Sequence, residues 1–310
     1  MGKLVAGQWV SSNIITSDQS GRYARQPRTF LETIDVSHSI FKPESKRYHL
    51  YISHACPWAT RVMMYRSLKD LAEHISVSVV HPDMLSHGWT FATDFEGATG
   101  DRLYGLSYLY ELYQKAQADI TTSVTVPVLW DTVTQQIVNN ESAQIIRIFN
   151  TSFNTLTGNT NDYYPLAHRE AIDAWNDLIY QQINNGVYRV GFAQNQAAYD
   201  DAVKGLFNTL ADLNDHLADK DFIVGDQLTE ADLRLIPTLL RFDLVYYVHF
   251  KTNLSRIADY PHLFRYTKNL FRIPAINANH HVEHIKRHYY YSHEMLNPRR
   301  IIPIGPKTFL

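Results

Sequence analysis

Alternating and helical patterns of apolar residues divide the first part of the chain into short elements. Residues 47–53 alternate and are rich in strand-forming side chains, which predicts a strand. From Trp58 to Leu71, apolar side chains recur with the period of a helix. Residues 75–80 predict a second strand, parallel to the first in a β-α-β unit. After a stretch rich in glycine and aromatic residues, residues 107–118 predict another helix.

A hairpin and a third helix complete this pattern. Residues 125–130 and 136–138 predict two strands joined by a polar turn. Residues 141–149 predict a helix that one of the two preceding asparagines can cap. The order β-α-β, inserted segment, β-β-α is that of a thioredoxin-like domain, and Pro127 stands where such a domain has a proline before its third strand. The first part of the chain is therefore predicted to be an α/β domain with a thioredoxin-like fold.

The second part of the chain has a helical pattern throughout. The start of one helix is marked by Thr229 with Asp232 three residues later, as in a capping box. The predicted helices cover residues 165–184, 197–217, 229–247 and 260–271. We therefore predict two domains, joined by a polar linker over residues 151–162. One covers residues 1–150, with an N-terminal extension and an insert near 84–120; the other is an all-α domain over 163–310 that ends in an extended tail, 297–310.

Composition excludes several classes of function. The 310 residues are 45% hydrophobic and 19% charged, with a formal net charge of -2, and no block rich in lysine or arginine predicts nucleic-acid binding. No apolar run approaches the roughly 20 residues that cross a bilayer, and the first residues are too polar for a signal peptide. We therefore expect a cytoplasmic protein that binds neither membrane nor nucleic acid.

The chain contains one cysteine, Cys56, between a predicted strand and a helix that Pro57 can start. The unpaired N–H groups and the positive dipole end of a helix stabilise a thiolate, whereas a free cysteine with a pKa near 8.5 is mostly protonated at neutral pH. A small buried apolar residue is the alternative, and position alone does not decide between the two. If Cys56 forms a disulfide during turnover, an external thiol must resolve it.

Three histidines, His280, His284 and His288, follow one another at intervals of four residues. On a helix this spacing can place imidazoles on one face, where a metal would bind them. The set matches no known metal motif, so we favour a partly solvated terminal helix and predict no metal site.

Many short motifs in the same order link the chain to one known family. They are 47–51 (Arg-Tyr-His-Leu-Tyr), 55–59 (Ala-Cys-Pro-Trp-Ala), 75–80 (Ile-Ser-Val-Ser-Val-Val), 88–91 (Gly-Trp-Thr-Phe), 97–101 (Gly-Ala-Thr-Gly-Asp), 124–131 (Val-Thr-Val-Pro-Val-Leu-Trp-Asp), 140–143 (Asn-Glu-Ser-Ala), 184–188 (Asn-Asn-Gly-Val-Tyr), 191–193 (Gly-Phe-Ala), 227–232 (Gln-Leu-Thr-Glu-Ala-Asp) and 288–289 (His-Tyr). On these motifs the chain resembles the glutathionyl-hydroquinone reductases, the Xi class of the glutathione transferases, over nearly its whole length.

The resemblance implies the glutathione transferase architecture and a reaction. Cys56 would attack the sulfur of a glutathionyl-hydroquinone, releasing the hydroquinone and leaving a mixed disulfide with glutathione. A second glutathione would resolve that disulfide, which agrees with the single cysteine. Glutathione is thus the implied cosubstrate, and the family implies a homodimer and an active site between the two domains.

The resemblance also implies a glutathione site. The backbone of Val126, held by a cis bond to Pro127, would pair with the cysteinyl part of glutathione. The helix that starts at Glu141 and Ser142 would hold the γ-glutamyl group, and Trp89 would pack against glutathione. Without the resemblance, each of these would be interpreted as an ordinary strand, helix or core residue.

Two tyrosines, Tyr188 and Tyr289, match the family's active-site tyrosines, which are expected to hydrogen-bond the quinol oxygen. Since the chain has 20 tyrosines, only the motifs single these two out. The chain departs from the family at Ser123, where an arginine commonly helps to hold glutathione. Either another basic residue compensates, or glutathione binds more weakly.

Two other functions remain open from the sequence. An omega-like thioltransferase or dehydroascorbate reductase also uses a Cys-Pro nucleophile, although the contexts of Trp89, Tyr188 and Tyr289 argue against it. A protein with the same fold that only binds or assembles would keep its role after Cys56→Ala.

Overall fold

The computed structural model describes residues 2–12 and 15–308, which form two compact units. Unit 1 holds residues 2–12 and 26–161, and unit 2 holds residues 15–25 and 162–308. The chain therefore enters unit 2 twice, because the segment 15–25 packs with helices that come much later in the sequence. None of the described helices is both long enough and apolar enough to cross a membrane.

Unit 1 is built around a four-stranded mixed sheet with the strand order β11-β10-β5-β6. These strands are β5 (Tyr48–Ile52), β6 (Ile75–Val79), β10 (Val128–Asp131) and β11 (Gln136–Asn139). β5 and β6 are parallel, whereas β10 is antiparallel to both β5 and β11. The predicted β-α-β and β-β-α order is therefore confirmed, and every residue of β5 is buried.

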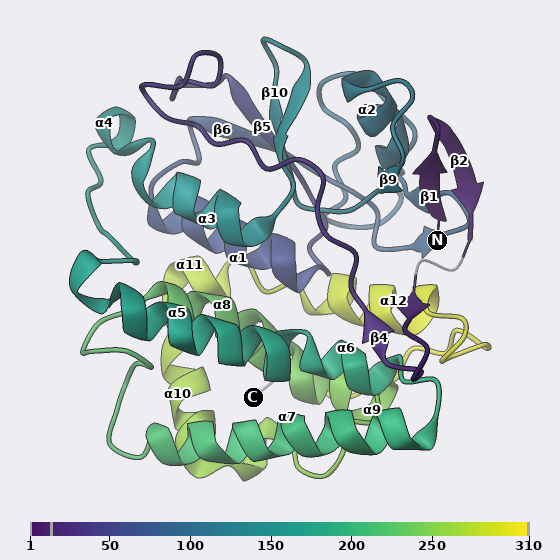
Figure 1. The fold of residues 1–310 in the computed structure, drawn as a ribbon, viewed down its shortest axis with the longest axis vertical. Coiled ribbons are helices and arrows are strands. Elements are labelled where there is room, and N and C mark those ends of the chain that lie inside the picture. Colours follow the sequence, from purple (N-terminus) through teal and green to yellow (C-terminus); the bar gives the residue numbers. More distant parts are fainter. Residues whose placement is uncertain (1, 13–14, 309–310) are drawn as a thin grey trace. The chain divides into compact units, whose positions relative to one another are not determined.

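Two helices of unit 1, α1 (Pro57–Leu68) and α3 (Ser142–Thr151), pack against each other on the same side of this sheet (Figure 1). The N-cap of α3 corrects the prediction, because it is Glu141 and neither asparagine. The Glu141 carboxylate accepts a hydrogen bond from the Ala143 amide (3.0 Å), and a negative charge suits the positive end of a helix. Asn139 instead ends β11 and accepts from the Glu141 amide (2.8 Å).

The remaining elements of unit 1 are short. The predicted insert contains the hairpin β7–β8 and the helix α2, and the predicted linker contains one helical turn, α4. A second sheet, of order β2-β1-β9, joins the first residues of the chain to a strand more than 100 residues later. The bounds are β1 (Gly2–Val5), β2 (Gln8–Ser11), β7 (Met84–Leu85), β8 (Gly88–Trp89), α2 (Leu109–Ala116), β9 (Thr122–Ser123) and α4 (Asn154–Thr157).

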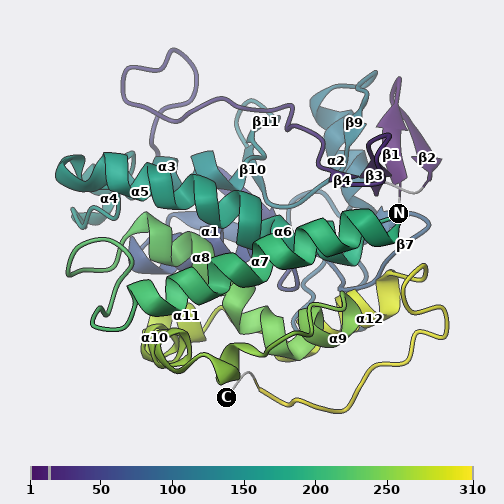
Figure 2. The same cartoon turned by 60° about the horizontal axis from the view of Figure 1, so that its bottom comes forward.

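Unit 2 is helical apart from one small hairpin in its early segment. The hairpin consists of β3 (Thr16–Ser17) and β4 (Tyr23–Ala24). The helices are η1 (Leu166–His168), α5 (Arg169–Leu178), η2 (Ile179–Asn184), α6 (Gly186–Gly191), α7 (Gln196–His216), α8 (Glu230–Arg241), η3 (Phe242–Tyr246), α9 (Tyr247–His249), η4 (Ile257–Asp259), α10 (Pro261–Phe271), α11 (Pro274–Asn277) and α12 (Val282–Ser292). Figures 1 and 2 show the long α7 running beside α6, and Figure 2 shows the extended chain that follows α12.

The predicted long helices form, with two differences. Two of them contain π turns, η2 and η3, which a pattern of apolar residues does not reveal. The short helix α6 was not predicted, because a glycine stands at each of its ends.

The capping box at the start of α8 is confirmed. The Asp232 carboxylate accepts from the backbone and hydroxyl of Thr229, from the Ile223 amide and from the Tyr266 hydroxyl. This fully buried carboxylate therefore ties α8 to α10 and to the loop before α8.

Candidate functional site

Cys56 is the N-cap of α1, and its backbone is extended with φ -77° and ψ 118°. Its carbonyl accepts from both the amide and the hydroxyl of Thr60 (3.0 Å each), which fixes the start of the helix. The first turn of α1 carries no acidic side chain. The positive end of the helix dipole is therefore not neutralised there and is available to stabilise a thiolate.

The sulfur of Cys56 lies against the segment that precedes β10. Its thiol donates a hydrogen bond to the carbonyl of Val126, with 3.6 Å between Sγ and the oxygen. The peptide bond from Val126 to Pro127 is cis, as the family resemblance implied. Unit 1 thus brings together three predicted site residues from segments that lie 70 residues apart in the sequence.

Glu141 and Ser142 lie at the start of α3, where both were expected. The Ser142 hydroxyl donates to the Glu141 carboxylate over 3.4 Å, and Ser142 is buried. A buried tyrosine that the sequence did not single out, Tyr113 of α2, connects this helix start to the segment before Val126. Its hydroxyl donates to the Thr125 carbonyl (2.8 Å) and accepts from the Asn140 amide group (3.3 Å). Tyr113 therefore fixes the segment before Val126 relative to the start of α3, and both belong to the predicted glutathione site.

Trp89 ends β8 and is buried. The hairpin of β7 and β8 is tied to the end of β6 by a hydrogen bond from the His81 amide to the Thr90 carbonyl (2.9 Å). Because β5 and β6 are parallel, their carboxyl ends meet at one edge of the sheet, and Cys56 follows β5 at that edge. Trp89 and Cys56 are therefore carried by the same edge of the sheet.

In unit 2, Tyr188 on α6 and Tyr289 on α12 meet at their hydroxyl groups, whose oxygens are 2.6 Å apart. A third tyrosine, Tyr246 of η3, places its hydroxyl oxygen 3.0 Å from that of Tyr289. Tyr246 could not be singled out beforehand, because it lies inside the predicted helix over residues 229–247, where an aromatic ring is an ordinary apolar side chain.

Burial raises the pKa of Tyr289 well above its usual value, and the neighbouring phenols of Tyr188 and Tyr246 raise it further. Two buried histidines lie close to this cluster, with Nε2 of His249 3.1 Å from Nδ1 of His293. Burial lowers the pKa of His249 to about 4 and that of His293 well below its usual value. At neutral pH, the Tyr289 phenol and the two imidazoles are therefore uncharged.

The three spaced histidines do not share one helix. His280 precedes α12, whereas His284 and His288 lie on it and are buried. The predicted partly solvated helix is found, since α12 buries most of its side chains in unit 2 while Glu283 is exposed. Within residues 2–12 and 15–308, no group of three or more His, Cys, Asp or Glu side chains is arranged to hold a metal ion.

Ser123 lies in β9, opposite Lys3 of β1 in the antiparallel register. Paired residues in an antiparallel sheet project their side chains to the same face. The chain therefore has a cation, Lys3, beside the position at which the family commonly has an arginine.

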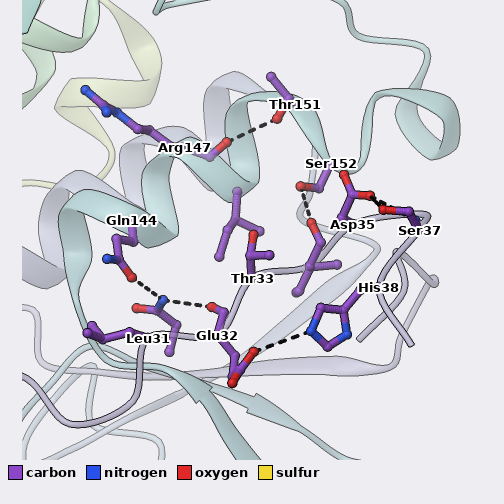
Figure 3. Close-up of a pocket in the computed structure, with 13 residues that line it drawn as sticks. Leu31, Glu32, Thr33, Asp35, Ser37, His38, Gln144, Arg147, Thr151 and Ser152 are labelled. Atoms are coloured by element: carbon purple, nitrogen blue, oxygen red, sulfur yellow. Dashed lines mark hydrogen bonds and ion pairs between the residues drawn. The ribbon is translucent and has the colours of Figure 1, made fainter. Parts of the chain in front are cut away.

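A separate hollow of about 620 Å³ lies in unit 1 between residues 31–38 and α3 (Figure 3). Polar groups along it bond to one another: Asn139 donates to the side chain of Gln144 (2.8 Å), and the Ser152 hydroxyl donates to the Ile34 carbonyl (2.6 Å). The residues described around the hollow include none of those predicted from the sequence, so it is distinct from the candidate site.

Two family descriptions match the chain. The glutathione S-transferase N-terminal domain matches residues 55–152, and the glutathione S-transferase C-terminal domain matches residues 196–269.

The chain is also similar to proteins of known name. It is 46% identical to the glutathionyl-hydroquinone reductase YqjG of Escherichia coli, across 99% of this chain and 95% of that protein. The glutathione-bound structure of YqjG superposes with a TM-score of 0.91 at 44% identity, covering 98% of this chain and 96% of that one. The glutathione S-transferase Xi of Phanerochaete chrysosporium superposes with a TM-score of 0.93 at 46% identity, covering 95% and 96%.

Proposed function

The chain belongs to the Xi class of the glutathione transferase family, and on this premise we propose that it is a glutathione-dependent reductase that removes glutathione from glutathionyl-hydroquinones. One observation carries the proposal. The only cysteine of the chain is the N-cap residue of α1, and its thiol donates to the carbonyl of Val126. This arrangement occurs in a protein that is 46% identical to a glutathionyl-hydroquinone reductase over 99% of its length.

In the proposed first step, the Cys56 thiolate attacks the sulfur that joins glutathione to the quinol ring. The sulfur–carbon bond breaks, a Cys56–glutathione disulfide forms, and the ring carbon gains a hydrogen. In the second step, the thiolate of free glutathione attacks this disulfide, which releases oxidised glutathione and restores Cys56. The conjugate and one glutathione thus become hydroquinone and oxidised glutathione, and the thiol hydrogen of that glutathione balances the new hydrogen on the ring.

We propose that the tyrosines bind the quinol oxygen. Breaking the sulfur–carbon bond of the aromatic quinol would leave an aryl carbanion, which is a poor leaving group. In the keto tautomer the sulfur-bearing carbon has already gained its hydrogen, so the electron pair of the broken bond can move onto the carbonyl oxygen. A hydrogen bond from the Tyr188 and Tyr289 pair to this oxygen stabilises the charge that develops there.

We propose that glutathione is held by groups at the edge of the unit 1 sheet. The backbone N–H and C=O of Val126 pair with the cysteinyl part, while the start of α3 binds the γ-glutamyl group, its ammonium against Glu141 and its carboxylate at Ser142. Trp89 packs against the tripeptide. The glutathione-bound structure of a relative at 44% identity supports glutathione as the cosubstrate.

Replacement of the nucleophile tests the proposal. Cys56→Ser should lower hydroquinone release by about 10³-fold or more, because a serine hydroxyl is not ionised at neutral pH. Wild-type protein mixed with a glutathionyl-hydroquinone should carry one glutathione on Cys56 by mass spectrometry, removable by dithiothreitol because the bond is a disulfide. Ser67→Ala, at the far end of α1, is the matched control and should retain activity. Hydroquinone release by Cys56→Ser at the wild-type rate would refute the proposal.

The rival enzymatic function is an omega-like thioltransferase or dehydroascorbate reductase. Both reactions would use the same thiolate, so the substrate has to separate them. We expect turnover of a glutathionyl-hydroquinone to exceed turnover of dehydroascorbate, and the reverse order would favour the rival. The homodimer, the cytoplasmic location and the division of the chain at residues 150 and 163 stay predictions.

A further inference from the structure

Tyr246 has no role in the proposed reaction, yet its hydroxyl oxygen lies 3.0 Å from that of Tyr289. We propose that Tyr246 is a positioning residue that orients a chain of hydroxyl groups, Tyr246 to Tyr289 to Tyr188, so that Tyr188 alone donates to the quinol oxygen. This inference rests on the proposed function and assigns different roles to the two predicted tyrosines.

Burial distinguishes the three members of this chain of hydroxyls. Tyr246 is 0% exposed and Tyr289 is 1% exposed, whereas Tyr188 is only half-buried. The Tyr289 hydroxyl lies between its two neighbours, at 2.6 Å from one oxygen and 3.0 Å from the other. Tyr289 can therefore act on a substrate only through Tyr188, which is the one of the three whose side chain is partly exposed.

Because each tyrosine hydroxyl carries a single hydrogen, the hydrogen bonds of the three tyrosines can all run in one direction. A phenol hydroxyl donates one hydrogen and accepts through its lone pairs. If Tyr246 donates to Tyr289 and Tyr289 donates to Tyr188, the hydrogen of Tyr188 points away from Tyr289. A quinol oxygen that gains negative charge favours this direction over its reverse, because each donated bond strengthens the next one along the chain.

The position of Tyr246 is closely defined by its ring. It stacks on Phe250 at 5.4 Å with 9° between the ring planes, and it packs edge-on against Tyr289 at 5.3 Å with 85° between them. Tyr246 also ends η3, a π turn that directly continues α8. A π turn holds more residues than an α turn, so it rotates the residues that follow about the helix axis, and such turns are frequent at functional sites.

Buried and uncharged neighbours strengthen the hydrogen bonds between the three tyrosine hydroxyls. Burial keeps the Tyr289 phenol neutral, although the buried guanidinium of Arg241 acts in the opposite sense and lowers the pKa of Tyr289. The nearby His249 is neutral, since burial lowers its pKa to about 4. In such a region of low dielectric, a hydrogen bond to a developing charge is stronger than it is in water.

Tyr246→Phe removes the first donor while it keeps the ring. We expect kcat for the unsubstituted glutathionyl-hydroquinone to fall about 3- to 10-fold, with KM unchanged because Tyr246 does not touch the substrate. The loss should shrink for chlorinated hydroquinones, whose oxygens are more acidic and need less stabilisation. A plot of log kcat against the pKa of the leaving quinol should therefore be steeper for Tyr246→Phe than for wild type.

The neighbouring Tyr247→Phe, at a residue that is partly exposed, is the matched control and should leave both kcat and this slope unchanged. If Tyr246→Phe does not fold, as judged by thermal melting, Tyr246→3-fluorotyrosine provides the second variant. Its hydroxyl is a stronger donor, and we expect it to raise kcat for the unsubstituted substrate.

An equal loss of kcat for all quinols, an unchanged kcat, or a loss confined to KM would overturn the role of Tyr246. These outcomes differ from a failure of the proposed function, in which the wild-type protein itself forms no glutathione adduct on Cys56.

Discussion

Replacement of Asp232 by alanine removes the acceptor of four hydrogen bonds at the start of α8. Two of the donors are the backbone amides of Ile223 (2.9 Å) and Thr229 (2.8 Å), and the others are the hydroxyls of Thr229 (3.0 Å) and Tyr266 (2.8 Å). Asp232 is 0% exposed, so water cannot replace the lost acceptor unless the structure opens. Burial raises the pKa of this carboxyl, whereas the four hydrogen bonds favour its charged form.

The expected loss follows from these contacts. Loss of an N-terminal cap costs about 0.5–2 kcal/mol, and a buried donor left without an acceptor costs about 1–3 kcal/mol. Because the four donors share one carboxylate and can partly rearrange, we expect Asp232→Ala to lower the free energy of unfolding by about 3–5 kcal/mol. Asp232→Asn keeps one acceptor oxygen and should lose less.

Urea unfolding followed by far-ultraviolet circular dichroism measures this loss, because the signal comes mainly from the helices. Asp226→Ala, in the exposed turn before α8, is the matched control and should change the free energy of unfolding by less than about 0.5 kcal/mol. A loss below about 1 kcal/mol for Asp232→Ala would refute the reasoning, since it would mean that the buried carboxylate is not needed to satisfy its donors.

Three further predictions concern pH and glutathione binding. Burial lowers the pKa of His49 to about 4, so the folded state holds this imidazole neutral, and stability is lost as the pH falls below about 6.5 towards 4. We expect the free energy of unfolding in urea to be about 2 kcal/mol lower at pH 5 than at pH 7, and His49→Gln should abolish this difference. Ser123→Arg should lower KM for glutathione and Lys3→Ala should raise it, each a few-fold in steady-state assays, through a charge near a glutathione carboxylate. Tyr113→Phe should raise KM for glutathione several-fold with a smaller effect on kcat, because the segment before Val126 is no longer tied to the start of α3.

Local patterns predicted most of the helices and the central strands. The β-α-β unit around Cys56 and the capping box of Thr229 and Asp232 depend on residues close together in the sequence, and both were found as predicted. The sheet formed by β1, β2 and β9 was missed, because it pairs Lys3 with Ser123 across the length of a domain. Contacts of such separation leave no periodic signal in either segment.

The residues of the candidate site that lie in family motifs could be predicted, and those outside the motifs could not. Cys56 was ambiguous by position, and only its neighbours indicated a nucleophile. Tyr113 and Tyr246 carry no motif, since their roles come from hydroxyl groups that meet partners from distant segments. A buried tyrosine looks like any apolar residue in a helical pattern until its hydrogen bonds are known.

The central claim is that one thiol, Cys56, removes glutathione from its conjugate and that a separate glutathione is needed to regenerate it. Single-turnover quenching with excess glutathionyl-hydroquinone and no free glutathione tests this claim most directly. The mechanism predicts release of one hydroquinone per chain together with one glutathione bound to Cys56, then a halt that added glutathione relieves. Continued turnover without free glutathione, or release of hydroquinone while Cys56 stays unmodified, would contradict it.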